Sequence, residues 1–130
     1  MRIHYVALLL ALFIGTQSAI PQKKSPTIVD KKSPITFVEL GSVNCIPCRQ
    51  MQSVMKAVEK KYGDQVKVVF YDVWKPEQKK YAEQYGIKLI PTQVFLDAGG
   101  KEFFRHEGFY PEAEIDKLLQ KQGLKIQTGS

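Results

Sequence analysis

Residues 35–49 read ITFVELGSVNCIPCR, in which a run of apolar and β-branched residues is followed closely by a Cys-x-x-Cys pair. The first six residues, ITFVEL, have the composition of a strand buried on both faces of a sheet. From 46 to 62 apolar residues recur at helical spacing, and a glycine follows. The stretch therefore predicts a strand-to-helix junction that carries Cys45 and Cys48, the only cysteines of the chain.

The rest of the chain continues this alternation of strands and helices. Five further elements follow: a strand at 66–73, a helix at 76–85, two strands at 92–97 and 101–107 around a glycine turn, and a C-terminal helix at 111–122. The resulting order is β-α-β-α-β-β-α. It predicts an α/β domain with a central mixed sheet flanked by helices.

The N-terminal residues have a different composition from the domain. Residues 6–14 read VALLLALFI, with Arg2 before them and small residues after them, which is typical of a signal peptide or an N-terminal anchor. We divide the chain into this leader (1–19), a Pro- and Lys-rich linker (20–34), one domain (35–123) and a C-terminal tail (124–130). Either form of leader predicts an extracytoplasmic domain, where disulfides persist.

The charge pattern argues against a nucleic-acid partner. The formal net charge is +6, but the lysines come in scattered pairs among acidic residues, and four of them lie in the linker. The sequence contains no Arg-rich helix and no aromatic RNA-binding motif. We therefore expect no nucleic acid, and a monomer is the default expectation for a chain of 130 residues with no oligomerisation signal.

Two thiols three residues apart suit a metal site, a structural disulfide or a redox pair. Zinc usually takes four ligands, and His4 and His106 are the only histidines, so we expect no metal. A disulfide that closes so short a loop adds little stability. At a helix N-terminus, however, the pKa of the Cys45 thiol should fall, so that Cys45 attacks and Cys48 resolves the mixed disulfide. The redox pair is favoured, and it needs no cofactor beyond its own disulfide.

Two other residues fit this chemistry. Glu39 interrupts a strand that should be buried, so its pKa should rise and it could exchange a proton with Cys48; alternatively, it lies at a frayed strand end and faces water. Pro91 stands just before a strand, where a proline removes a ladder donor. A cis peptide bond after Ile90 is one reason for such a proline, although spacing alone does not predict it.

Three segments in this order, FVELGSVNCIPC, YGIKLIPT and VFLDAGGKEFFRHEGF, resemble thioredoxin, and the resemblance covers about residues 35–122. It implies the thioredoxin fold and protein clients with thiols or disulfides. Its implied catalytic residues are Cys45 as nucleophile, Cys48 as resolving cysteine, Pro91 as the cis-proline and Glu39 as the buried carboxylate. Its implied substrate groove includes Ile46, Pro47, Ile90 and Gly108.

The sequence departs from that family around the cysteines. Asn44 and Ile46 replace the usual Trp and Gly, Gly41 replaces a second Trp, and the lysine that partners the buried carboxylate has no clear counterpart. A proline immediately before the second cysteine, here Pro47, resembles the reducing members of the family. We therefore expect a protein-disulfide reductase. It would take electrons from a membrane carrier, with clients such as apocytochrome c. The alternatives are a thiol oxidase or isomerase on the same fold, or a non-enzymatic module that binds a partner or Cu(I).

Overall fold

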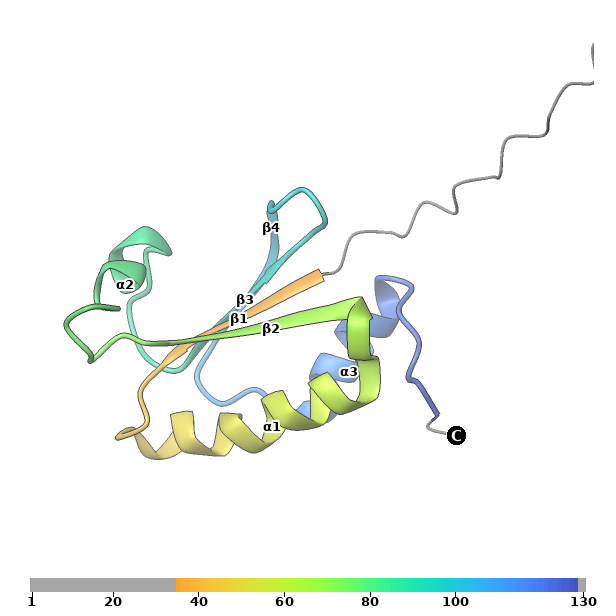
Figure 1. The fold of residues 1–130 in the computed structure, drawn as a ribbon, viewed down its shortest axis with the longest axis horizontal. Helices are drawn as coiled ribbons and strands as arrows, with labels where there is room; N and C mark the ends of the chain where they lie inside the picture. Colours follow the sequence, from red (N-terminus) through yellow and green to blue (C-terminus); the bar gives the residue numbers. More distant parts are fainter. Residues whose placement is uncertain (1–34, 129–130) are drawn as a thin grey trace, which may run out of the picture.

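Strand β1 (Ile35–Gly41) lies inside a four-stranded sheet of order β2-β1-β3-β4. In the computed structural model, which describes residues 35–128, β1 pairs in parallel with β2 (Val66–Asp72) and antiparallel with β3 (Thr92–Leu96), as Figure 1 shows. Strand β4 (Glu102–Glu107) lies antiparallel to β3. The predicted mixed sheet is confirmed, and the leader and linker lie outside the described residues.

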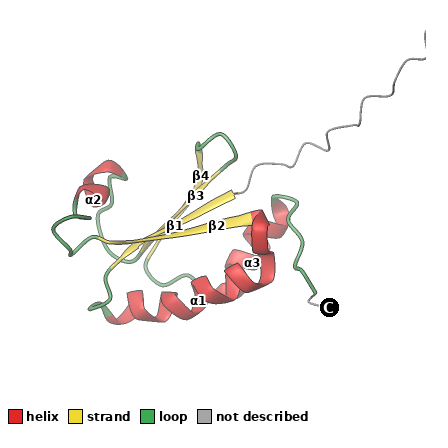
Figure 2. Ribbon diagram, viewed as in Figure 1, coloured by secondary structure: helices red, strands yellow, loops and turns green. Residues whose placement is uncertain are grey.

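Helices cover both faces of this sheet (Figure 2). Helices α1 (Ile46–Tyr62) and α3 (Glu112–Lys121) pack on one face, where the core includes Phe37 and Phe95 in a stacked pair with centroids 4.7 Å apart. The short helix α2 (Lys80–Gln84) contributes to a smaller core on the other face. Because side chains alternate along a strand, β1 is buried on both sides, as its apolar run predicts.

Helix α1 has the predicted bounds, whereas the prediction for α2 is wrong over its first half. Residues 76–79, expected to be helical, form turns instead. The Gln78 side-chain oxygen accepts the Asp72 amide at 2.7 Å, and Lys75 O accepts the amides of Gln78 and Lys79 at 3.0 and 2.9 Å. These bonds hold the segment against the end of β2, so that regular helix begins only at Lys80.

The strand directions bring four loops to one edge of the sheet, which we call the site edge. The C-terminal ends of β1, β2 and β4 meet the N-terminal end of β3 there, so its loops are 42–45, 73–79, 87–91 and 108–111. At the opposite end, Leu124 is buried and the Gln127 amide donates to Lys61 O at 2.7 Å. The chain therefore continues to pack on the domain beyond residue 123.

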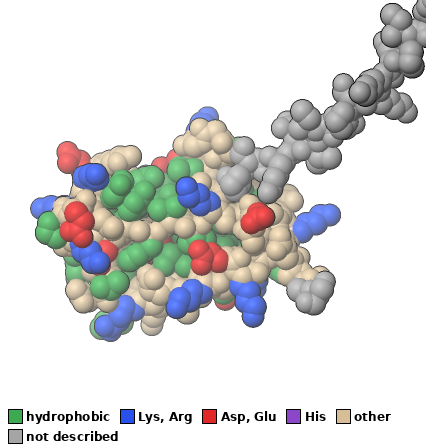
Figure 3. Space-filling view, in the orientation of Figure 1, with side chains coloured by type: hydrophobic (Ala, Val, Ile, Leu, Met, Phe, Trp, Pro, Cys, Tyr) green, Lys and Arg blue, Asp and Glu red, His purple; other side chains and the backbone are tan. Residues whose placement is uncertain are grey.

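The surface mixes charges of both signs. Figure 3 shows Lys and Arg side chains spread among acidic ones over the face in view, with hydrophobic side chains gathered between α2 and the β3–β4 hairpin. Among residues 35–128, no helix is long and apolar enough to span a bilayer.

Candidate functional site

The two cysteines form a disulfide in which the sulfurs differ in exposure. Cys45 and Cys48 are bonded, with their Cα atoms 5.2 Å apart, at the start of α1. Cys45 is 9% exposed, whereas Cys48 is 0% exposed. A client sulfur can therefore approach Cys45 from solvent, while Cys48 is enclosed by the protein.

Helix α1 begins in a way that favours negative charge on Cys45. Cys45 is the N-cap residue, and its Sγ accepts the Cys48 amide at 3.4 Å. Pro47 lies in the first turn, where a proline costs no hydrogen bond, and this turn contains no acidic residue. A hydrogen bond to sulfur and the positive end of the helix both stabilise a thiolate, so the position of Cys45 suits an attacking sulfur.

Asp72 fixes the loop that carries the cysteines. Its buried carboxylate accepts the Val43 amide at 3.3 Å through one oxygen and the Trp74 amide at 3.2 Å through the other. The Ser42 hydroxyl accepts the Asn44 amide at 3.2 Å. Asp72 thus joins the loops after β1 and β2. Sequence reasoning missed it, although an acidic residue at the end of an apolar strand was a visible signal.

The predicted cis-proline and glycine lie together at the site edge. The Ile90–Pro91 peptide bond is cis, and the Gly108 amide donates to Pro91 O at 2.8 Å. Gly108 has φ of 90°, a conformation that L side chains rarely adopt. Thr92, the next residue after the proline, pairs with Leu40 near the end of β1. The proline loop therefore adjoins the strand that leads to the cysteines.

Glu39 is buried beneath this loop, so the interpretation as a frayed, water-facing residue is wrong. It is 0% exposed, and it lies on the same face of β1 as Phe37 and Gly41. A Cβ at Gly41 would come within 3.2 Å of Cys48 Sγ, which places Cys48 against this face. Burial raises the pKa of Glu39 from 4.5 to about 8, although a hydrogen bond from Gln93 opposes the rise.

The partner of Glu39 is a glutamine rather than a lysine. Gln93 Nε2 donates to Glu39 Oε1 at 3.4 Å, and both side chains are fully buried. Sequence reasoning missed Gln93 because its pairing with Glu39 depends on the register of β1 and β3, which residue spacing does not give. A polar residue within a buried strand was the available signal.

Exposed apolar side chains lie at the edge of the sheet that carries the disulfide. Ile46 is 67% exposed and Trp74 is 59% exposed. We define the apolar rim as the exposed large hydrophobic residues in the loops of the site edge and at the first position of α1: Val43, Ile46, Trp74, Leu89 and Phe109. Of the predicted groove residues, Ile46 and Pro47 are exposed, and Ile90 and Gly108 are half-buried.

His106 is half-buried and contacts a residue of the rim. Its ring stacks on Tyr110 at 4.3 Å between centroids, and its Nε2 lies 3.2 Å from Phe109 O. His106 therefore helps to hold the loop that presents Phe109.

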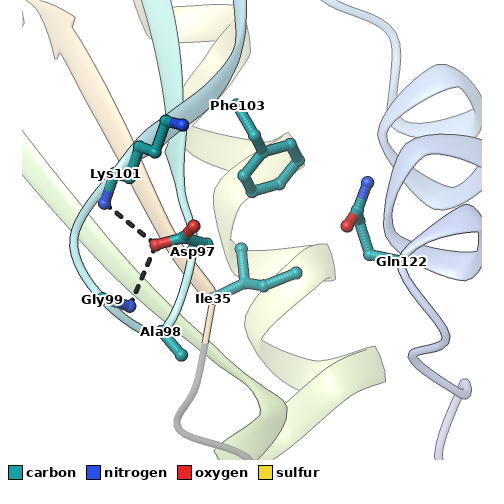
Figure 4. A pocket seen from close by; sticks show the side chains of 7 residues that line it. All are labelled: Ile35, Asp97, Ala98, Gly99, Lys101, Phe103 and Gln122. Carbon is teal, nitrogen blue, oxygen red and sulfur yellow. Dashed lines mark hydrogen bonds between the residues drawn. The ribbon is translucent and has the colours of Figure 1, made fainter.

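A pocket at the opposite end of the sheet does not belong to the site. It has a volume of about 280 Å³ and is lined by Ile35, Phe103 and the hairpin around Asp97 (Figure 4). Ile35 begins β1, and the six strand residues that follow it separate it from the site edge by roughly 20 Å. Among the described residues, no group of three or more His, Cys, Asp or Glu side chains is placed to hold a metal ion.

The chain is similar to proteins of one family. The sequence pattern of the thioredoxin-like domain family matches residues 21–123. A Synechocystis thioredoxin is 30% identical over 108 residues, covering 80% of this chain and 97% of that protein. Thioredoxin 1 of Synechococcus elongatus is 33% identical over 95 residues, covering 72% and 84%.

Solved structures agree with this relationship. Deadhead, a germline-specific thioredoxin of Drosophila, superposes with a TM-score of 0.60 at 26% identity, covering 68% of this chain and 81% of that one. Thioredoxin-2 of a malaria parasite gives a TM-score of 0.62 and covers 68% and 82%. At 20% identity, the second comparison supports the fold alone.

Proposed function

The chain belongs to the thioredoxin-like domain family, and from this premise we propose that it reduces disulfides of client proteins outside the cytoplasm. It is a thiol–disulfide oxidoreductase whose redox pair is Cys45–Cys48. The observation that carries the proposed direction of attack is the unequal exposure of the two sulfurs, with the accessible one at the helix N-cap.

Cys45, Cys48, one proton carrier, Glu39, and water account for every electron and proton of the proposed reaction. The Cys45 thiolate attacks a client disulfide, the client S–S bond breaks, and the released client thiolate takes a proton from water. The Cys48 thiol then gives its proton to Glu39 and attacks Cys45 Sγ. The second client thiolate leaves, and the Cys45–Cys48 disulfide closes. Two electrons have passed to the client, so a reductant must restore the dithiol.

The apolar rim supports a polypeptide client. Its side chains lie in all four loops around Cys45, so a segment bound across them would bury apolar area on both sides of the reacting sulfur. We propose that preferred clients carry apolar residues beside their cysteines. Apocytochrome c and wrongly paired secreted proteins are two candidates.

The proposed location and electron supply are based on the sequence. The apolar leader with a preceding arginine supports secretion or anchoring, and a domain outside the cytoplasm would need a membrane carrier as its source of electrons. Alkylation of reduced Cys45 in intact cells by a membrane-impermeant thiol reagent tests this. Labelling only after cell lysis would overturn the extracytoplasmic proposal.

The reduction potential of the disulfide tests the direction of the reaction. We expect a value near about −270 mV, as for thioredoxin, in dithiol and glutathione buffers on a chain beginning at Ile20. A value near about −120 mV would mean that the dithiol form is stabilised and that the protein is an oxidase.

Trapping experiments test the roles of the cysteines. Cys48→Ala should accumulate mixed disulfides with clients, because the resolving thiol is absent. Cys45→Ala should accumulate few, because its remaining thiol is enclosed. Equal trapping by the two variants would overturn the assignment, and no trapping by either would indicate a binding module.

A further inference from the structure

Glu39 and Gln93 are directly opposed in the centre of the sheet. They are register partners in the antiparallel pairing of β1 and β3, and both are 0% exposed. The register partners Phe37 and Phe95, two residues along each strand, stack on the α1 face of the sheet. Because side chains alternate, Glu39 and Gln93 point to this same face.

Each of the two side chains has a buried oxygen without a partner. Gln93 Nε2 donates to Glu39 Oε1 at 3.4 Å, but neither Glu39 Oε2 nor Gln93 Oε1 has a hydrogen-bond partner among the described residues. An ionised carboxylate and an amide oxygen are both acceptors, so they cannot satisfy each other. A proton on Glu39 Oε2 makes that oxygen a donor, and it can then bond to Gln93 Oε1.

We propose that Gln93 is a positioning residue that holds the neutral carboxyl group of Glu39 by two hydrogen bonds, from Gln93 Nε2 to Glu39 Oε1 and from Glu39 Oε2 to Gln93 Oε1. When Glu39 loses its proton, the second bond is lost and two acceptors face each other. The pair therefore distinguishes the two protonation states: two hydrogen bonds fix the plane of the neutral carboxyl group, and one bond, from Gln93 Nε2 to Oε1, remains to the ionised form.

In the described part of the chain, the neighbours of Glu39 other than Gln93 form no hydrogen bond that would position its carboxyl group. Its register partner on β2 is Phe70, which is apolar, and α1 brings Cys48 to the adjacent position of Gly41. His106 on β4 pairs with Gln93 and so lies one strand further away. Cys48, His106 and Tyr110, which stacks on His106, are the ionisable groups on this face near the pair. Among residues 35–128, only Gln93 hydrogen-bonds to the carboxyl group.

This inference rests on the proposed role of Glu39 as the proton acceptor for Cys48. When the Cys48 thiol attacks the mixed disulfide, its proton passes to Glu39, and Gln93 Oε1 accepts a hydrogen bond from the newly protonated oxygen. A carboxyl group fixed in this way receives the proton without turning in the core. When the disulfide is reduced again, Glu39 returns this proton to Cys48.

The infrared carbonyl band of protonated Glu39 tests the pair. The band is identified as the one that is absent in Glu39→Gln, and we expect Gln93→Met to shift it to higher frequency because both hydrogen bonds are lost. The matched control is Gln65→Met, whose amide bonds to Tyr62 O and Lys125 O far from Glu39. The control should lower stability and leave the band unchanged. An unshifted band in Gln93→Met would overturn the proposal.

A second measurement uses the unsubstituted full chain, in case Gln93→Met does not fold. The side-chain amide ¹⁵N and ¹H resonances of Gln93 should titrate together with the Glu39 carbonyl band, and in Glu39→Gln they should be independent of pH. Resonances that do not follow the band would overturn the pair. If they follow it while Glu39→Gln reduces clients at the unchanged rate, the pair stands and the proposed role of Glu39 in reduction fails.

Discussion

At the level of single residues, Glu39 links protonation to folding. Burial raises its pKa to about 8 in the folded protein, against 4.5 in an unfolded chain. Between these values the folded state binds more protons than the unfolded state, so stability falls as pH rises. The stabilisation is complete below about pH 4.5 and is lost as pH rises through about 8.

We expect the free energy of unfolding to decrease between pH 5 and 8, by at most about 1.4 kcal/mol per pH unit from this residue. Glu39→Gln should lack this component, because the amide does not ionise. Urea unfolding of both proteins at several pH values measures the difference between their free energies of unfolding. The contributions of the other titrating groups are the same in both proteins and cancel in this difference. Parallel curves would show that Glu39 has an ordinary pKa.

Gly41 is the residue against which Cys48 packs. A Cβ at this position would lie 3.2 Å from both Cys48 Cβ and Cys48 Sγ and 3.5 Å from Phe70. The large side chain usual in thioredoxins therefore has no room here without rearrangement. The close approach explains why this chain has a glycine.

Gly41→Ala should destabilise the protein by about 1–3 kcal/mol, the usual cost of overpacking a core. It should also change the reduction potential, because the added methyl group presses on Cys48. Denaturant unfolding of the oxidised and reduced forms measures both effects. The matched control is Gly99→Ala, where the new Cβ meets only an Asp97 oxygen at 3.4 Å. Equal losses in the two variants would contradict the steric argument.

At the level of elements, the loops after β1 and β2 behave as one unit through Asp72. We expect Asp72→Ala to cost about 2 kcal/mol, since two amides lose their acceptor. It should also slow the reduction of clients, because the Val43 amide lies in the cysteine loop. Urea unfolding and single-turnover kinetics measure the two effects.

The hairpin between β3 and β4 offers a control for this prediction. Asp97 Oδ1 accepts the Gly99 and Lys101 amides at 2.9 Å each, at the end of the sheet remote from the cysteines. Asp97→Ala should lose comparable stability and keep its reduction rate. A rate loss in Asp97→Ala as large as that in Asp72→Ala would indicate a general effect of stability.

The sequence predicts elements well where local pattern and burial agree. Helix α1 has a long apolar period, a proline near its start and a glycine at its end, and its predicted bounds are correct. For α2, Pro76 predicted the start of the helix. In the structure, the hydrogen bond between Gln78 and Asp72 at the end of β2 holds this segment in turns instead. Gln93 was missed for a related reason, since both contacts join segments whose alignment is set by tertiary structure.

At the level of the whole molecule, the apolar rim should determine affinity for protein clients. We expect the double substitution Leu89→Ser and Phe109→Ser to lower kcat/KM for a protein disulfide about tenfold, which corresponds to about 1.4 kcal/mol of lost burial. The effect should fall on KM. Reduction of a small-molecule disulfide should be unchanged, because such a substrate does not extend over the rim.

The control for this substitution is Ile126→Ser. Ile126 is also an exposed large hydrophobic residue, but it lies in the C-terminal segment that packs near the end of α1. Its replacement should leave kcat/KM unchanged for both kinds of substrate. A comparable loss in Ile126→Ser would mean that the rim has no special role.

The described part of the chain begins and ends away from the N-terminal end of α1 (Figure 1), where the cysteines lie. Ile35 starts β1 at the end opposite the site edge, and the residues after α3 pack at the far end of α1. The point where the described chain begins and the disulfide therefore lie at opposite ends of the sheet. A protein attached to a bead or an electrode through the chain before Ile35 should therefore present its disulfide away from the surface, so that it can react with clients while it is attached.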